Sequence, residues 1–218
     1  MCEYFEYHRE TMSDSVTVRL AEALDTAILK LYVLTSQPDK LDTFALATNH
    51  VHLGSAVELL ESFQMYHVVA LLYLSRKMGR QALEVWKKLG SGEVEEEGFD
   101  GVEETVDYLR SCNNNELVLE FGEWVIRKNP TQGMAILTKA TRSPPIPDDM
   151  VLKFLTTTLA DMRDQRLPMQ YLEYLVYEAG SKEERYHTRL AREYIDRVIL
   201  LRDDTMTHEA LTATHRDR

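Results

Sequence analysis

Apolar residues spaced three and four positions apart constrain this chain more than any other feature of its sequence. The first such stretch carries Val16, Leu20, Ala23, Ala27, Ile28, Leu31 and Leu34. This spacing places side chains on one face of an α-helix, and comparable stretches recur as far as Leu201. Because the 218 residues include only nine Gly and six Pro, turns are scarce. We therefore predict an all-α fold.

Short breaks divide the pattern into successive helices. Helices are predicted to begin at Asp14 or Ser15, at Pro38 and at Ser55, then to span 66–78, 80–89, 102–111, 115–128, 148–159, 168–180 and 181 to about 201, with a short helical turn after Thr131. Pro38 suits a first helical turn, and Gly79 suits the left-handed position after a helix. Ser55–Glu58 and Ser181–Glu184 have the spacing of capping boxes. The run Val68–Leu72 is expected to be a helix that is apolar on several faces and packed from both sides.

Short turns between helices favour antiparallel hairpins stacked in sequence. No strict period emerges, so the prediction is an irregular α-solenoid rather than an array of fixed-length repeats. We expect an N-terminal extension over 1–13, the solenoid over 14–201, and a polar, disordered tail over 202–218.

The charge balance bears on possible partners. Acidic residues number 36 against 25 basic ones, and the formal net charge is −11. Without a basic run, direct nucleic-acid binding is not expected, and an anionic bilayer would repel the chain. The longest apolar run, Val68–Leu74, is too short to span a membrane. Membrane association is thus expected to be peripheral and through partners.

Cysteine usage indicates a reducing compartment. Cys2 and Cys112 are the only cysteines, and they form no CxxC pair. A disulfide framework is therefore not expected. The acidic, aromatic N-terminus has no basic segment leading into an apolar one, so we do not interpret it as a secretory signal. A cytoplasmic location follows.

The histidines are the first candidates for a chemical site. His50 and His52 could supply two metal ligands, but zinc takes three or four, and no further His or Cys lies nearby in the sequence. A structural or surface role is the favoured interpretation. His67 and His187 stand next to tyrosines and are expected to pack or form hydrogen bonds.

Other candidate reactive groups lack supporting neighbours. Glu116, Glu120 and Glu123 fall near one helical face and are interpreted as a solvated face rather than as acid/base catalysts. Cys112 has only Arg110 as a basic neighbour and is expected to be a small buried residue. No GxSxG, P-loop or GxGxxG motif occurs. The sequence therefore predicts no catalytic residue, no cofactor and no metal.

The remaining conspicuous features have a structural and a binding interpretation. Trp86 and Trp124 are expected in the core or between hairpins, with an interface anchor as the alternative. The acidic loop Glu93–Asp100 is expected to be a solvated linker, or else a docking strip for a basic partner. The segment Ser143–Pro147 contains PxxP and is expected to be a stiff linker. The alternatives are an SH3 ligand and phosphorylation at Ser143.

The order of the packing residues resembles a known family. The relevant segments are Asp25–Tyr32, Asn49–His50, Leu71–Tyr73 with Lys77, Ala82, Leu83 and Trp86, Val106–Leu109, Glu116–Val118 with Phe121, Trp124, Val125 and Lys128, Tyr171–Val176, and Tyr186–His187 with Leu190, Ala191 and Tyr194. They resemble the middle helical region of the family of vacuolar sorting protein 39 and transforming growth factor-β receptor-associated protein 1. The receptor-associated member is the more similar, through the last of these segments.

The resemblance implies a scaffold segment of a CORVET- or HOPS-type vesicle-tethering complex, with a helical region like the clathrin heavy-chain repeats. It implies other tether subunits as partners, Rab GTPases indirectly, and a peripheral location on endosomal membranes. This sequence contains neither the family's β-propeller-like citron homology domain nor its zinc-ligand cysteines, so we expect a segment of the family's full architecture. Two alternatives stay open, which are a signalling adaptor for transforming growth factor-β receptors or Smad-type proteins, and a helical enzyme.

Overall fold

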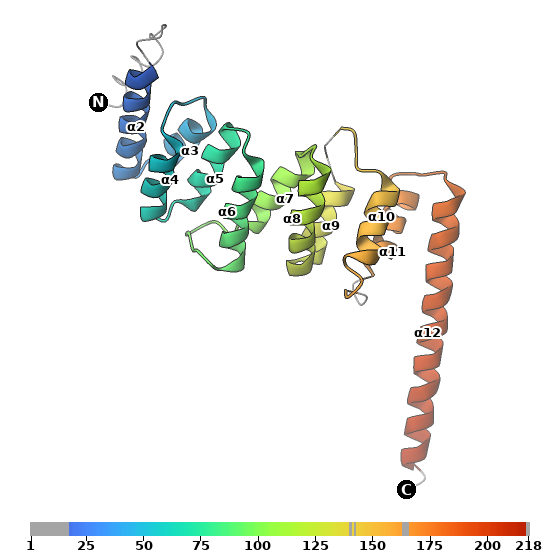
Figure 1. The fold of residues 1–218 in the computed structure, drawn as a ribbon. Coiled ribbons are helices and arrows are strands. Elements are labelled where there is room, and N and C mark those ends of the chain that lie inside the picture. The colour runs from blue at the N-terminus through green and yellow to red at the C-terminus, as the bar shows by residue number, and fades with distance from the viewer. Residues whose placement is uncertain (1–17, 140, 142, 163–165, 217–218) are drawn as a thin grey trace. The chain divides into compact units, whose positions relative to one another are not determined.

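The computed structural model describes residues 18–139, 141, 143–162 and 166–216 (Figure 1). The helices are α2 (Val18–Leu34), α3 (Pro38–Leu46), α4 (Leu53–Ser62), α5 (Tyr66–Ser75), α6 (Gly79–Ser91), α7 (Val102–Ser111), α8 (Asn115–Lys128), α9 (Pro130–Thr138), α10 (Asp148–Thr157), α11 (Leu167–Glu173), the π-helical turn η2 (Tyr174–Glu178) and α12 (Glu184–Arg216). Over these residues the only strand-like pairing is an isolated bridge between Glu96 and Phe99. The predicted all-α fold class is confirmed.

The chain divides into two compact units, residues 1–109 and 110–218, which are described separately. In the first unit α2 packs on α3 and α4, α5 packs on α3 and α4, and α6 packs on α5. In the second unit α8 pairs with α9, α10 with α11, and α11 with α12. Helices close in sequence are therefore packed against one another, as predicted for an irregular α-solenoid of hairpins.

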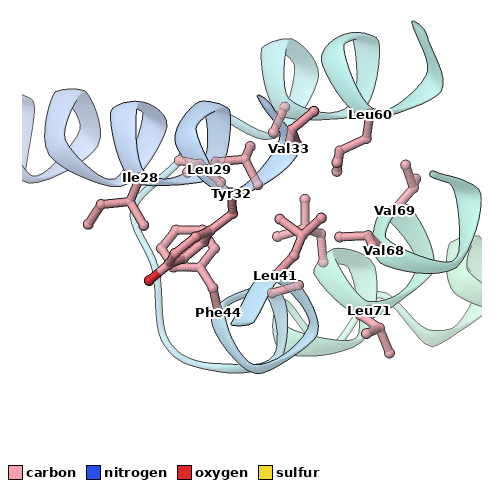
Figure 2. Packing of buried hydrophobic residues seen from close by; sticks show 14 residues of the cluster. Ile28, Leu29, Tyr32, Val33, Leu41, Phe44, Leu60, Val68, Val69 and Leu71 are labelled. Atoms are coloured by element: carbon pink, nitrogen blue, oxygen red, sulfur yellow. The ribbon is translucent and has the colours of Figure 1, made fainter. Parts of the chain in front are cut away.

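An apolar core joins α2 to α5 in the first unit (Figure 2). Leu29 from α2, Leu60 from α4 and Leu72 from α5 have no exposed surface. Tyr32 and Phe44 meet edge to face, with ring centroids 6.1 Å apart. Every residue of Val68–Leu72 is buried, because α5 lies between α3, α4 and α6. The prediction that this run is a helix packed on several faces is confirmed.

The buried face of α2 differs from the predicted stripe. Leu20 and Leu34 are exposed, whereas Ile28, Leu29 and Val33 are buried. The helix carries apolar residues on more than one face, and its contacts with α3 and α4 decide which face is covered. Asp14, Ser15 and Val16, where this helix was predicted to begin, lie outside the described residues.

Four helix ends in the first unit share one backbone geometry. A residue with positive φ follows the C-cap of α2, α4 and α5 and is the C-cap itself in α6, and in all four paired backbone hydrogen bonds close the turn in the pattern of the Schellman motif. The left-handed residues are Ser36, Gln64, Lys77 and Gly92. The prediction that Gly79 would hold this position was wrong. Gly79 instead starts α6, where a Cβ would lie 2.1 Å from the Tyr108 hydroxyl.

The second unit contains an equally close approach. A Cβ placed on Gly133 of α9 would lie 2.4 Å from Ile126 Cγ1 of α8. Ile126 and Ile136 are fully buried between these helices. The short helical turn predicted after Thr131 is a helix spanning Pro130–Thr138, because Pro130 occupies its first turn and the Asn129 side chain caps it.

The last helix is longer than predicted. It packs on α11, and Tyr186 and Leu190 in its first turns are both buried. It then continues past Leu201, the predicted end, and runs to Arg216, well beyond α10 and α11 (Figure 1). The segment from 202, expected to be a disordered tail, is thus helical as far as Arg216 in the structure.

Candidate functional site

The acidic loop after α6 is held against the N-terminus of α5. Glu96 Oε2 accepts a hydrogen bond of 2.6 Å from the backbone N–H of His67, which lies 29 residues earlier. The rings of His67 and Phe99 stack with centroids 3.9 Å apart and an interplanar angle of 11°. Met65, the N-cap residue of α5, provides no side-chain acceptor. The Glu96 carboxylate, which is distant in sequence, supplies the acceptor that a capping side chain would provide, and its negative charge is favourable at a helix N-terminus.

Burial controls the protonation of this contact. It raises the pKa of Glu96, although N–H groups of His67 and Tyr66 donate to that carboxylate and oppose the rise. Burial also lowers the pKa of His67 and raises that of Glu104. His67 Nδ1 and Glu104 Oε2 are buried without a hydrogen-bond partner. The site therefore favours a neutral His67, and the expected packing role of this histidine is confirmed.

Two of the loop's remaining carboxylates serve local structure. Asp100 Oδ1 accepts hydrogen bonds from the N–H groups of Val102, at 2.8 Å, and Glu103, at 3.2 Å, at the start of α7. Glu93 accepts one from the Ser91 hydroxyl. Glu95 and Glu97 are exposed. The loop is thus a docked part of the hairpin rather than a plain linker, and any docking strip reduces to Glu95 and Glu97.

The structure gives His50 and His52 separate structural roles. The backbone N–H of His50 donates to Asp25 Oδ2 at 2.7 Å, and its ring Nδ1 lies 3.3 Å from the same oxygen. His52 Nδ1 accepts from the Ser55 N–H and caps α4. The cap of α4 was predicted at Ser55, so that prediction was wrong by three positions. Across the described part of the chain, no group of three or more His, Cys, Asp and Glu could hold a metal ion.

Polar residues whose contacts the sequence analysis missed, buried Asp25 and half-buried Arg76, hold the connection between α3 and α4. Asp25 has no exposed surface, and it anchors His50 as described above. Arg76 donates to Asn49 Oδ1 at 3.0 Å and to the Val51 carbonyl at 2.8 Å. Asp25 stands inside an apolar helical stretch, which was the available signal. The partners of Arg76 lie 25 to 27 residues away and gave no local signal.

The α8 carboxylates form a solvated face, as predicted. Glu116 and Glu120 are exposed, and Glu123 pairs with Arg127 at 2.9 Å. Arg127 also contacts Asp161 at 2.6 Å and donates to the Thr158 carbonyl. These hydrogen bonds, first that to Asp161, raise the pKa of Arg127. The cluster links α8 to the end of α10, and catalysis is not indicated.

The proline-rich break leads into a polar cluster. Ile146 is buried, so the segment is anchored on the second unit, in agreement with a linker role. Asp148 Oδ1 accepts a hydrogen bond of 2.9 Å from the Tyr171 hydroxyl and Oδ2 a longer one from Tyr186. A cleft beside Asp148 is lined mainly by apolar residues. Burial and the Asp148 charge raise the pKa of Tyr171, so its phenol stays protonated. Such a tyrosine stabilises structure and does not serve as a base.

The other candidates have simple positions. Trp86 is buried, in agreement with its predicted core role. Trp124 is half-buried, and Lys128 Nζ lies 6.0 Å from its ring centroid. His187 Nε2 lies 2.8 Å from the Ser181 carbonyl, as expected of a hydrogen-bonded histidine. Cys112 was expected to be buried, but it is partly exposed because it lies in the turn after α7. No helix among the described residues is both long and apolar enough to cross a bilayer.

Comparison with known proteins adds to this description. The family described as vacuolar sorting protein 39 domain 1 matches residues 24–126. Residues 24–126 belong to the vacuolar sorting protein 39 family. The chain is 31% identical over 95% of its length to the transforming growth factor-beta receptor-associated protein 1 homolog of Danio rerio, and 30% identical over 92% to the Homo sapiens protein of that name. The Vam6/Vps39-like protein of Homo sapiens is 26% identical over 83% of the chain.

These relatives are much longer than the chain. It spans 24% of the Danio rerio protein and 23% of its Homo sapiens counterpart. No solved structure matches. The resemblance to this family, and the greater similarity to its receptor-associated members, are therefore confirmed. The family match covers the hairpins of the first unit, including the docked acidic loop.

Proposed function

We propose that this chain is a non-catalytic scaffold segment of an endosomal or vacuolar vesicle-tethering complex of the CORVET or HOPS type. The family match over residues 24–126 carries the proposal. Relatives that match over more than four-fifths of the chain are named for vacuolar protein sorting. The proposed role is to space and orient binding elements and to contact other subunits through the helical surface.

The arrangement of the first unit supports a scaffold role. Apolar side chains fill the interior formed by α2 to α5 (Figure 2). Binding to other proteins would therefore use the exposed surface. A solenoid exposes much surface for its length, so lateral contacts with other subunits are available. Exposed Glu95 and Glu97 stand on a loop fixed by Glu96 and Phe99, so little conformational entropy would be lost on binding there.

The chain's charge bears on its location. With a net charge of −11, direct attachment to an anionic bilayer is unfavourable. Recruitment to endosomal membranes would then pass through other tether subunits, and contact with Rab GTPases would be indirect. We expect the chain alone to bind a Rab weakly at most.

The names of the receptor-associated relatives favour a second candidate function. Those proteins are named for association with the transforming growth factor-beta receptor. An adaptor for such receptors, or for Smad-type signalling proteins, would use the same exposed helical surface. The two functions differ in the partner that copurifies, and a single purification can distinguish them.

The test is affinity purification of the chain from cells, followed by pull-downs with purified tether subunits and a GTP-loaded endosomal Rab. We expect tether subunits to copurify and Rab binding to be weak. A Glu95→Lys/Glu97→Lys variant should lose subunit binding if the loop contributes. The matched control Glu58→Lys/Glu61→Lys makes the same charge change on exposed positions of α4.

Each outcome has a distinct meaning. Tight, GTP-dependent Rab binding without any tether subunit would refute the scaffold proposal. Receptors or Smad-type proteins in place of tether subunits would support the adaptor. Equal subunit binding by both charge variants would remove the acidic loop from the interface and leave the scaffold role intact.

A further inference from the structure

Among the side chains that the structure describes, exposed large apolar ones are most numerous on α12. The exposed fractions are 59% for Ile195, 65% for Val198 and 45% for Ile199. We call these residues the α12 strip. The helix packs on α11 and η2, and its residues Tyr186 and Leu190 are only 2% and 3% exposed. Aliphatic side chains this exposed on a helix that packs elsewhere indicate a surface for a partner.

Helix geometry places the strip away from the packed face. Ile195 and Ile199 are four residues apart and share one face, with Val198 beside them. Successive residues turn by about 100°, which puts Ile199 on the side opposite Leu190. Ile195 and Ile199 therefore lie on a different face of the helix from Tyr186 and Leu190, and Val198 lies between the two faces. A second element can cover the strip while α11 keeps its own contact.

Arginines lie at the N-terminal end of the strip. Arg189 and Arg192 line a shallow depression with Glu184, Arg185 and Thr188, about one to two turns before Ile195. Arg185 is already paired with Asp149 at 2.7 Å, whereas Arg189 is half-buried and Arg192 is exposed. Glu193 and Asp196 lie among them, but Arg197 and Arg202 continue the positive charge along the strip. Such a basic stretch stands out in a chain of net charge −11.

We propose that the α12 strip binds an amphipathic helix of a protein partner, with apolar residues over the strip and acidic residues opposite Arg189 and Arg192. This is helix-against-helix recognition, in which an apolar ridge supplies affinity and flanking charges set orientation. The inference does not depend on the tethering role proposed above.

Charge argues against a second copy and against a membrane. In a parallel pair of α12 helices Arg192 would face its own copy, and in an antiparallel pair centred on the strip it would approach Arg202. Like charges at such positions are destabilising. An anionic bilayer would attract the arginines but repel a chain of net charge −11. An amphipathic helix with acidic flanks would cover the apolar strip and pair with the arginines.

The test uses the full 218-residue chain and a fluorescent synthetic helix of about 20 residues, with Leu at every third and fourth position and Glu on both flanks. A matched peptide carries Lys in place of Glu. Fluorescence anisotropy should show tighter binding of the Glu peptide. An Ile195→Asp/Ile199→Asp variant should weaken binding by about tenfold or more. Leu34→Asp, on an exposed leucine of α2, is the control and should bind like wild type.

A charge-reversal variant tests the same proposal without altering the strip. In Arg189→Glu/Arg192→Glu the preference should pass from the Glu peptide to the Lys peptide, and circular dichroism checks that helix content is kept. Equal binding of both peptides, or no binding, would overturn the proposal. So would dimers in sedimentation velocity that the aspartate variant abolishes, which indicate a second copy. Flotation with phosphatidylserine-containing vesicles, lost in the aspartate variant, would assign the strip to a membrane instead.

Discussion

Gly122 and Gly133 allow the packing of α8 on α9 to be tested with one substitution made at two places. A Cβ on Gly122 would meet nothing within 4 Å, although the residue is buried in the middle of α8. Alanine is favoured over glycine inside a helix by about 0.5–1 kcal/mol. We therefore expect Gly122→Ala to raise the free energy of unfolding by about that amount.

Gly133→Ala should have the opposite effect. Its Cβ would lie 2.4 Å from Ile126 Cγ1, 2.6 Å from Ile126 Cα and 2.7 Å from Ile126 N. Carbon atoms in ordinary contact are about 3.5–4.0 Å apart, so α9 would have to move away from α8 by about an ångström. Overpacking of this kind costs roughly 1–3 kcal/mol. The helix propensity of alanine offsets less than about 1 kcal/mol of that cost, and a net loss of about 1–2 kcal/mol is expected.

Urea unfolding followed by far-UV circular dichroism measures both variants. The midpoint should rise for Gly122→Ala and fall for Gly133→Ala, with similar slopes. Since the chemical change is the same, unfolded-state effects largely cancel between the two variants. Equal midpoints, or a more stable Gly133→Ala, would refute the close approach of α9 to the Ile126 backbone.

Further predictions concern the docked loop and the thiol. Burial lowers the pKa of His67 below 6.5, so its neutral form favours the fold and stability should fall as pH drops below 6.5. Urea titrations at a series of pH values should show that His67→Phe removes this component, and an unchanged pH profile would contradict it. Phe99→Ala should reduce hydrogen-exchange protection of loop 93–100, whereas Phe63→Ala, on a half-exposed ring, should not. Partly exposed Cys112 should react with a maleimide in the folded chain, and complete protection until urea is added would show that it is buried.

The sequence predicted those helices whose signals are local. The bounds of α7 and α8 agree with prediction, and α3 begins at Pro38 as expected. In each case apolar spacing coincides with a starting signal, such as the Asn114 side chain that caps α8. Sequence order was also sufficient for the family, because many weakly specific packing residues recur in the same order.

Contacts between distant residues were beyond the reach of such patterns. The Glu96 carboxylate caps α5 from 29 residues away, and nothing near Met65 reveals it. Because α2 carries apolar residues on two overlapping faces, its sequence alone does not show which face is buried. The contacts with α3 and α4 determine it. Of the candidate sites, the acidic loop could be located from composition, but its fixed conformation could not. The exposed strip on α12 was missed because Val198 was assigned to the packed face.

At the recurring helix ends of the first unit, the backbone conformation of the turn does not depend on which side chain occupies the left-handed position. Backbone N–H and carbonyl groups close each turn, and only one of the left-handed positions is glycine. Ser36, Gln64 and Lys77 are all exposed there. What repeats along this unit is therefore a backbone motif without a matching residue motif, which explains why no period is visible in the sequence. The polar side chains at these turns can therefore be substituted at little cost to the stability of the hairpins. Such positions allow the surface that partners recognise to change while the packing of the helices is kept.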